Sequence, residues 1–135
     1  MLSFAHFQPE DGIPIYQQIL LHVKRGIVAG VVQNGDEMPS RRVLSALLGV
    51  NPNTIQKAYR MLEEEALMTS HAGAKSVIVL DEARAQAVRA ELLACDARGA
   101  VRAFRSAGLT LSESQALLAQ YWDDAQTQPN PKDEV

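Results

Sequence analysis

Residues 38–62 read MPSRRVLSALLGVNPNTIQKAYRML. We interpret this stretch as two short amphipathic helices that are joined by a tight turn containing glycine. It has no acidic residue, although the whole chain has a formal net charge of −3. Its basic residues are Arg41, Arg42, Lys57 and Arg60. Because phosphates attract a positive surface and a short helix fits the major groove, the stretch indicates a helix-turn-helix that contacts duplex DNA.

Helix-capping residues mark both ends of the first helix and the start of the second. Ser40 is a good N-cap for the first helix, and Gly49 ends it. Asn51 caps the second helix and Pro52 takes its first position, where a missing N–H costs little. The first helix is expected to bury Leu44, Leu47 and Leu48, and the second to bury Ile55, Ala58, Tyr59 and Leu62. The opposite face of the second helix carries Asn53, Gln56, Lys57 and Arg60.

The flanking residues predict a winged helix, in which a β-hairpin follows the helix-turn-helix. An earlier helix is expected from about Ile15 to Ala29, with its apolar residues at helical spacing. Two short strands are expected at 68–71 and 76–80, joined by the turn at 72–75. The predicted class is mainly α with a small β-hairpin (α+β), and two further helices follow the wing.

The predicted organisation has four parts. Residues 1–12 form an extended or loose arm, 13–80 the winged-helix DNA-binding domain, 81–124 a helical region, and 125–135 a disordered polar tail. The first helix of the helical region runs to about Arg105 and could break near Gly99. The second helix begins at Thr110, where Thr-Leu-Ser-Glu matches a capping box.

The helical region carries more apolar surface than two isolated helices can bury on themselves. We therefore expect it to pair with a second copy of the chain, and an unknown small-molecule effector is a further candidate partner. The residues expected at this interface are Leu92, Leu93, Val101, Phe104, Leu117, Leu118, Tyr121 and Trp122. Tyr121 and Trp122 could instead stack on a small effector, but packing is the favoured interpretation.

Composition narrows the class of protein. Apolar residues make up 47% of the 135 residues and charged residues 21%, which is typical of a globular chain. The sequence pI of about 5.6 restricts any DNA contact to a local surface. The single cysteine, Cys95, forms no internal disulfide, fits a reducing cytoplasm, and is expected to be buried. No apolar run is long enough for a membrane span, and the N-terminus lacks a signal-peptide pattern.

Catalytic and cofactor chemistry is not indicated. There is no nucleophile–His–acid set, no Gly-rich phosphate loop and no cluster with metal-ligand spacing. The run Glu63-Glu64-Glu65 is expected to be a solvated helix end, because consecutive helix positions do not converge on one ion. We therefore expect no enzyme activity, no cofactor and no metal.

Several short motifs resemble the GntR family of bacterial transcription regulators, and within it the YtrA-like subfamily. They are Pro14-Ile-Tyr-Gln-Gln-Ile19, Gly35-Asp36, Pro39-Ser40-Arg41-Arg42-Val43-Leu44, residues 48–55 (LGVNPNTI), and Ala58-Tyr59 followed by Leu62, Glu65 and Leu67. The match covers about residues 13–80. The resemblance implies a homodimer that binds a palindromic operator in double-stranded DNA and represses an operon, often one that includes its own gene.

The resemblance also implies which residues meet DNA. Arg42 occupies the family's contacting arginine position, and Arg41 stands beside it. The second helix of the helix-turn-helix is the family's recognition helix. Its start and its outward positions, together with the tip of the wing, supply the remaining contacts: Asn51, Asn53, Thr54, Gln56, Lys57, Arg60, His71, Gly73 and Lys75.

Two positions depart from the family pattern. Ala66 stands where the family usually has glycine at the end of the recognition helix, and alanine in a left-handed conformation there would cost about 1 kcal/mol. The wing, residues 70–77, lacks one glycine and the aromatic residue of the family pattern, and its Lys75 comes late. The departures affect the wing more than the two helices of the helix-turn-helix.

Two other functions compete with a complete DNA-binding regulator. A winged helix can act as a protein–protein adaptor without binding DNA, but an adaptor would have a neutral or acidic recognition helix. The chain could also be the DNA-binding front end of a longer effector-binding or aminotransferase-like protein. The cationic recognition helix favours a DNA-binding regulator over the adaptor.

Overall fold

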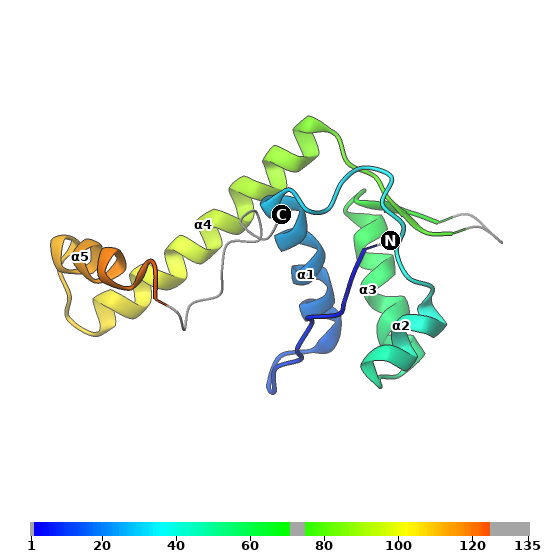
Figure 1. Ribbon diagram of the computed structural model, residues 1–135, viewed down its shortest axis with the longest axis horizontal. Helices are drawn as coiled ribbons and strands as arrows, with labels where there is room; N and C mark the ends of the chain where they lie inside the picture. Colours follow the sequence, from blue (N-terminus) through cyan, green and yellow to red (C-terminus); the bar gives the residue numbers. More distant parts are fainter. Residues whose placement is uncertain (1, 71–74, 125–135) are drawn as a thin grey trace. The chain divides into compact units, whose positions relative to one another are not determined.

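The helix-turn-helix predicted from the caps is present in the computed structural model, which describes residues 2–70 and 75–124. In chain order the elements are α1 (Ile15–Ala29), α2 (Arg41–Leu48), α3 (Pro52–Glu64), β1 (Met68–Thr69), β2 (Val77–Ile78), α4 (Glu82–Ser106) and α5 (Leu111–Tyr121) (Figure 1). One compact unit ends at Arg89, within α4, and a second begins at Ala90. The α+β class is therefore confirmed.

Local interactions explain where α2 begins and ends and where α3 begins. The Ser40 hydroxyl accepts a hydrogen bond from the Val43 backbone N–H at 3.1 Å. The Asn51 side chain accepts one from the Asn53 N–H at 2.8 Å, and Pro52 fills the first helical position. Between the helices, Gly49 has a left-handed φ of +68°, which lets the chain turn sharply. These caps confirm the boundaries predicted from the sequence.

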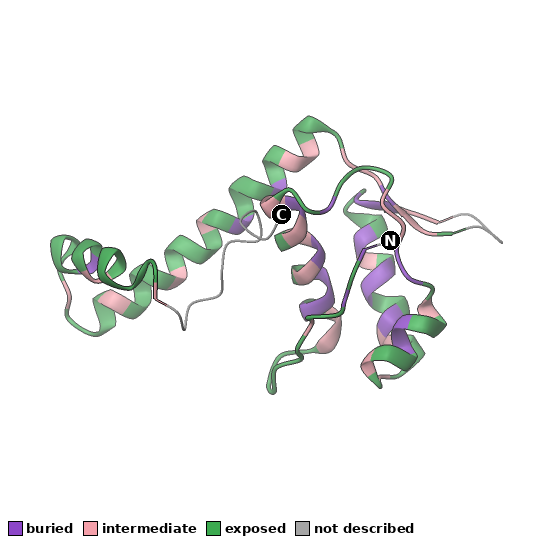
Figure 2. Ribbon diagram, viewed as in Figure 1, coloured by how far each residue is buried: buried purple, intermediate pink, exposed green. Residues whose placement is uncertain are grey.

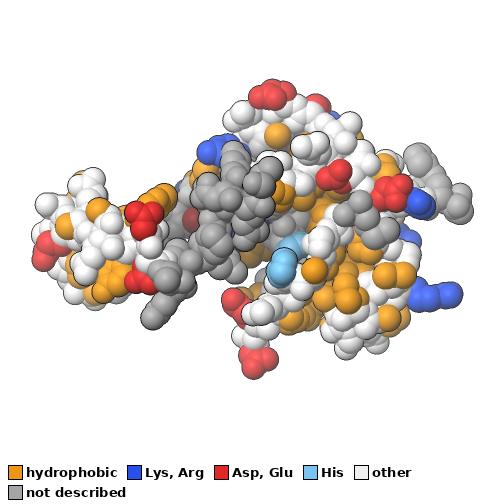
Figure 3. All heavy atoms as spheres, viewed as in Figure 1, with side chains coloured by type: hydrophobic (Ala, Val, Ile, Leu, Met, Phe, Trp, Pro, Cys, Tyr) orange, Lys and Arg blue, Asp and Glu red, His pale blue; other side chains and the backbone are white. Residues whose placement is uncertain are grey.

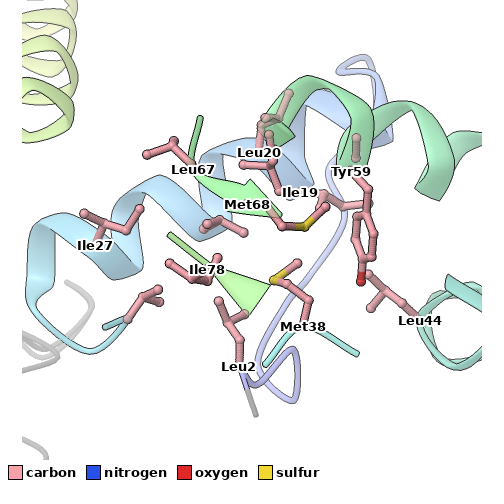
Figure 4. Packing of buried hydrophobic residues seen from close by; sticks show 14 of the residues in the cluster. Leu2, Ile19, Leu20, Ile27, Met38, Leu44, Tyr59, Leu67, Met68 and Ile78 are labelled. Carbon is pink, nitrogen blue, oxygen red and sulfur yellow. The ribbon is translucent and has the colours of Figure 1, made fainter. Parts of the chain in front are cut away.

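The core of the first unit lies between α1, α3 and the hairpin. Ile19 and Val23 of α1 and Ile55 and Leu62 of α3 are fully buried. Figure 2 shows the buried residues on α1 and α3, and Figure 4 shows their side chains meeting those of Met68 and Ile78 from the strands. The helical spacing therefore predicted the inward faces of α1 and α3. On α2, Leu44 is fully buried, but Leu47 is 61% exposed, so its predicted burial is wrong.

The N-terminal segment belongs to this core and is not a loose arm. Leu2 and Phe4 are buried, and the Leu2 N–H donates to the Glu37 carbonyl oxygen at 2.7 Å. Figure 4 places Leu2 in the same cluster as Met38 and Ile78. The Phe4 ring also lies 4.6 Å from the His22 ring, centroid to centroid. The burial of Leu2 and Phe4 favours an ordered segment.

The hairpin is shorter than the sequence predicts. β1 and β2 pair antiparallel, with Met68 opposite Ile78 and Thr69 opposite Val77. An antiparallel bridge between Glu37 and Val77 pairs the loop between α1 and α2 with β2. The segment before α2 therefore supports the base of the hairpin by pairing along β2.

The turn between α3 and β1 has left-handed backbone at a residue with a side chain. Ala66 has a φ of +59°, and it is the positive-φ residue other than glycine in the described part of the chain. Its N–H donates to the Glu63 carbonyl oxygen at 3.0 Å, and the Leu67 N–H donates to the Leu62 carbonyl oxygen at 2.9 Å. The two hydrogen bonds close the end of α3. The turn therefore keeps the left-handed backbone that favours glycine, and the Cβ of Ala66 makes this backbone sterically unfavourable.

In the second unit, α5 has the capping box predicted from the sequence. The Glu113 N–H donates to the Thr110 hydroxyl at 3.2 Å, and the Thr110 N–H donates to the Glu113 carboxylate at 3.0 Å. The hydrogen bond from the Thr110 backbone N–H lowers the pKa of the Glu113 carboxyl. Gly108 precedes the box with a φ of +83° and permits the turn after α4.

Two expectations for α4 are wrong. The helix continues through Gly99 without a break. A single glycine within a long helix reduces stability without necessarily ending the helix. Cys95 is exposed and not buried. The cysteine lies on a helix whose surface is largely exposed, as Figure 2 shows for α4.

Candidate nucleic-acid interface

The outward face of α3 gathers the polar residues that were predicted to contact DNA. Asn53, Gln56, Lys57 and Arg60 are exposed, while Thr54 is half-buried. The N-cap Asn51 is exposed at the start of the same helix. The buried residues of α3 occupy the opposite face and anchor it to the core. The helix therefore presents a polar and cationic face from a rigid base.

The two arginines at the start of α2 have different surroundings. The Arg41 guanidinium carbon lies 5.6 Å from the centroid of the Tyr59 ring, and one guanidinium nitrogen lies 4.0 Å from the Glu63 carboxylate. The Arg41 Nε is buried and has no hydrogen-bond partner. Arg42 is exposed and makes no ion pair with any described residue. Arg41 thus packs against α3, whereas the Arg42 guanidinium is available to a ligand.

A buried hydrogen bond joins α3 to the start of α2. The Tyr59 hydroxyl donates to the Pro39 carbonyl oxygen, one residue before the Ser40 cap. Burial raises the pKa of the Tyr59 phenol well above its usual range, and the positive charge of Arg41 opposes this shift. The phenol therefore stays protonated and keeps donating at any physiological pH, which fixes the first turn of α2 relative to α3.

Lys57 rests on an aromatic ring that lies outside the helix-turn-helix. Its Nζ is 3.9 Å from the centroid of the Tyr16 ring, in the first turn of α1. No sequence pattern indicated a role for Tyr16 at the site. Tyr16 stands 41 positions before Lys57, so helical spacing does not predict this contact. The motif that begins at Pro14 indicated only that Tyr16 lies in α1.

The three glutamates at the end of α3 each pair with a basic side chain. Arg41 lies near Glu63, Arg60 Nε lies 3.9 Å from Glu64, and Lys24 of α1 lies 2.7 Å from Glu65. The glutamates are exposed, as predicted. They are also partners of nearby cations, so the positive charge of Arg60 is partly offset on the surface.

The base of the wing carries one further cation. Lys75 is exposed, and its Nζ lies 3.2 Å from a carboxylate oxygen of Glu37. The Ser70 and Ser76 hydroxyls meet at 2.7 Å on the two sides of the hairpin. His71 and Gly73, also predicted to contact DNA, lie outside the described residues.

The second unit exposes apolar side chains that were predicted to bind a second copy. Leu93, Val101, Leu118 and Tyr121 are exposed, and Trp122 is 76% exposed. Phe104 and Leu117 are half-buried, whereas Leu92 is buried in the single chain and offers little surface. The helices α4 and α5 pack sparsely on one another, and Figure 3 shows hydrophobic side chains on the surface of the part that carries α5.

The described residues contain neither a metal-binding cluster nor a membrane-spanning helix. In residues 2–70 and 75–124, no group of three or more His, Cys, Asp or Glu side chains is placed to hold a metal ion. In the same residues, no helix combines the length and apolar character needed to cross a membrane.

Comparison with known proteins places the chain in a family. The profile described as "Bacterial regulatory proteins, gntR family" matches residues 15–78. The chain is 38% identical over 65 residues to the HTH-type transcriptional repressor YtrA of Bacillus subtilis, covering 48% of this chain and 50% of YtrA. It is 32% identical over 113 residues to the HTH-type transcriptional regulator Rv1152 of Mycobacterium tuberculosis, covering 84% of this chain and 89% of that protein.

A solved structure has the same fold over most of the chain. It is a GntR family transcriptional regulator from Listeria monocytogenes, with a TM-score of 0.75 and 28% identity, covering 83% of this chain and 98% of that one. The chain spans half or less of the length of the first curated relatives it matches, YtrA and the regulator GgaR of Escherichia coli. The match to Rv1152, by contrast, runs through nearly all of both proteins and beyond the winged helix. With the helix caps, the recognition-helix face and the wing base all in place, the chain belongs to the GntR family.

Proposed function

We propose that this chain is a sequence-specific DNA-binding transcriptional regulator that works as a homodimer and represses an operon, with its own gene among the targets. The observation that carries the proposal is the outward face of α3, where Asn53, Gln56, Lys57 and Arg60 stand together on a helix anchored by its buried side. Amide side chains read base edges in the major groove, and lysine and arginine also neutralise phosphates.

Arg42 adds a second contact at the start of α2. Its side chain is exposed and has no carboxylate partner among the described residues, so its charge is available to a phosphate or a guanine edge. Asn51 and Thr54 at the start of α3 and Lys75 at the base of the wing extend the proposed surface. His71 and Gly73 remain proposed contacts on the basis of the family resemblance.

Two arguments support the proposed pairing of two chains: the length of DNA that one winged helix reads, and the exposed apolar surface of α4 and α5. A single winged helix reads few base pairs, whereas two related by a twofold axis read a palindrome with far more discrimination. The exposed apolar residues of α4 and α5 supply a surface for that pairing, since the two helices pack sparsely on one another. The repressor role rests on the similarity to YtrA, which is a transcriptional repressor, and we propose that the protein acts on DNA in the cytoplasm.

Selection from a random pool of duplexes tests the proposed function. We expect enrichment of a palindromic sequence, and retention on heparin at low salt despite the acidic pI. A variant with both Lys57→Ala and Arg60→Ala should bind this duplex more weakly, and the slope of log affinity against log salt should fall by about 0.9 for each lost phosphate contact.

A matched control loses two positive charges elsewhere. Arg84 pairs with Asp81 in the first turn of α4, and Arg89 donates to the Val28 carbonyl oxygen. Changing both to alanine should leave the salt slope unchanged. Equal losses in the two double variants would mean that net charge, and not the α3 face, controls binding. If the selection enriches no duplex, the proposal is overturned.

A further inference from the structure

The Tyr16 ring is a fixed platform beneath the Lys57 ammonium. Lys57 Nζ lies 3.9 Å from the ring centroid, closer than the 5.6 Å between the Arg41 guanidinium carbon and the Tyr59 ring. The Tyr16 side chain is half-buried and packs against the core of the first unit. Its hydroxyl accepts a hydrogen bond from the Gln17 side-chain amide at 3.1 Å. Core packing therefore holds the ring while one face receives the lysine.

Lys57 is held by an aromatic ring, whereas three other cations in or beside the proposed interface are held by carboxylates. Arg41, Arg60 and Lys75 each lie within 4.0 Å of a carboxylate oxygen. Those carboxylates offset the positive charge and must be displaced or tolerated when a phosphate approaches. An aromatic face attracts an ammonium group through its quadrupole and has no net charge. The Tyr16 ring therefore orders Lys57 without cancelling its charge.

We propose that Tyr16 is a positioning residue for DNA binding, whose ring holds the Lys57 ammonium where it meets a phosphate. The inference rests on the proposed DNA-binding function. A free lysine side chain loses much rotamer freedom when it is immobilised, so a lysine that is already ordered binds with a smaller entropic loss. The N-terminal turn of α1, outside the helix-turn-helix, thereby contributes to affinity through Lys57.

A double-mutant cycle on the full chain measures this coupling. Affinity for the selected duplex is compared among the wild type, Tyr16→Leu, Lys57→Met and the double variant. Tyr16→Leu keeps an apolar side chain against the core but removes the ring. We expect it to weaken binding by about threefold in the wild-type background and to have no further effect when Lys57 is already methionine. Tyr16→Phe, which retains the ring face, should bind nearly as well as wild type.

The outcomes separate this inference from the proposed function. If the wild type binds a duplex and Tyr16→Leu weakens binding equally with and without Lys57, Tyr16 has only a structural role and the inference is overturned. If the wild type binds no duplex, the proposed function fails and the inference fails with it. Thermal melting of each variant shows whether an affinity change arises from unfolding.

A spectroscopic measurement on the wild type needs no substitution. Protons on the Lys57 side chain that lie over the Tyr16 ring should have NMR signals shifted upfield by the ring current, both in the free protein and in the DNA complex. Tyr16→Phe should keep this shift. Loss of the shift when DNA binds would mean that Lys57 leaves the ring to reach the phosphate, and would overturn the positioning role even if Tyr16→Leu failed to fold.

Discussion

The Tyr59 hydroxyl donates a hydrogen bond to the carbonyl oxygen of Pro39, which joins the buried face of α3 to the residue that precedes the cap of α2. Both residues are buried. The α2 helix is short and has few buried residues of its own. Its start, and with it the position of Arg42, therefore depends on this contact and on Leu44.

Removing that hydroxyl should destabilise the protein. Tyr59→Phe leaves the Pro39 carbonyl oxygen buried without a donor, so we expect the free energy of unfolding to fall by about 1–3 kcal/mol. Urea denaturation measures the change. Tyr16→Phe is the matched control, because it removes a hydroxyl whose bond to Gln17 is exposed, and it should change stability little. Equal effects would argue against a special role for the Tyr59 contact.

The adjacent arginines should separate affinity from stability. Arg42→Ala should cost about 1–3 kcal/mol in binding to the selected duplex if the contact is bidentate, and should change the free energy of unfolding by less than about 0.5 kcal/mol. Arg41→Ala should act mainly on stability, because the Arg41 side chain packs on Tyr59 and lies near Glu63. Binding titrations and urea melts on both variants measure the two effects. A loss of stability with normal affinity in Arg42→Ala would show that Arg42 is structural.

Neutralising a glutamate beside the proposed interface should strengthen DNA binding. Glu64 lies 3.9 Å from Arg60 Nε, and both side chains are exposed. Glu64→Gln removes a negative charge near the phosphates and releases the arginine, so we expect a gain of about 0.2–1 kcal/mol in binding. Glu91→Gln, which removes an exposed carboxylate of α4, is the control. The prediction fails if both substitutions raise affinity equally.

Glycine should suit position 66 better than alanine. Ala66 has a φ of +59°, where an L-residue with a side chain loses about 1–2 kcal/mol and glycine does not. Because glycine also loses about 0.5–1 kcal/mol more chain entropy on folding, Ala66→Gly should stabilise the protein by up to about 1 kcal/mol. Ala87→Gly, at an exposed position inside α4, should destabilise it by about 1 kcal/mol. If the left-handed backbone is the cause, thermal unfolding should show a higher melting temperature for Ala66→Gly and a lower one for Ala87→Gly.

Assembly should depend on the apolar surface of α5. Leu118 and Trp122 are exposed, and changing both to serine should convert a dimer to a monomer while α5 keeps its capping box. Leu47→Ser changes an exposed leucine of α2 and should leave assembly intact. Sedimentation velocity at micromolar concentration measures both. A wild-type monomer, or a dimer that survives the double substitution, would contradict the proposed pairing surface.

Local interactions explain which elements could be predicted from the sequence. The caps at Ser40 and Asn51, the capping box at Thr110 and the left-handed Gly49 depend on neighbours within a few residues. Their sequence patterns therefore predicted both ends of α2, the start of α3 and the start of α5. The helical period likewise separated the buried face of α3 from the polar face. These features are determined by the sequence because the contacts that create them are short in range.

Contacts between distant residues required the tertiary structure. Helical spacing places Leu44 and Leu47 near one face of α2, but the packing of α2 on α3 decides that Leu44 is covered and Leu47 is not. Tyr59 selects Arg41 over Arg42 as the packed arginine, Tyr16 meets Lys57 across 41 positions, and Glu37 holds Leu2 through a backbone bond. A periodic pattern shows which side chains share a face, whereas burial depends on which elements fold against that face.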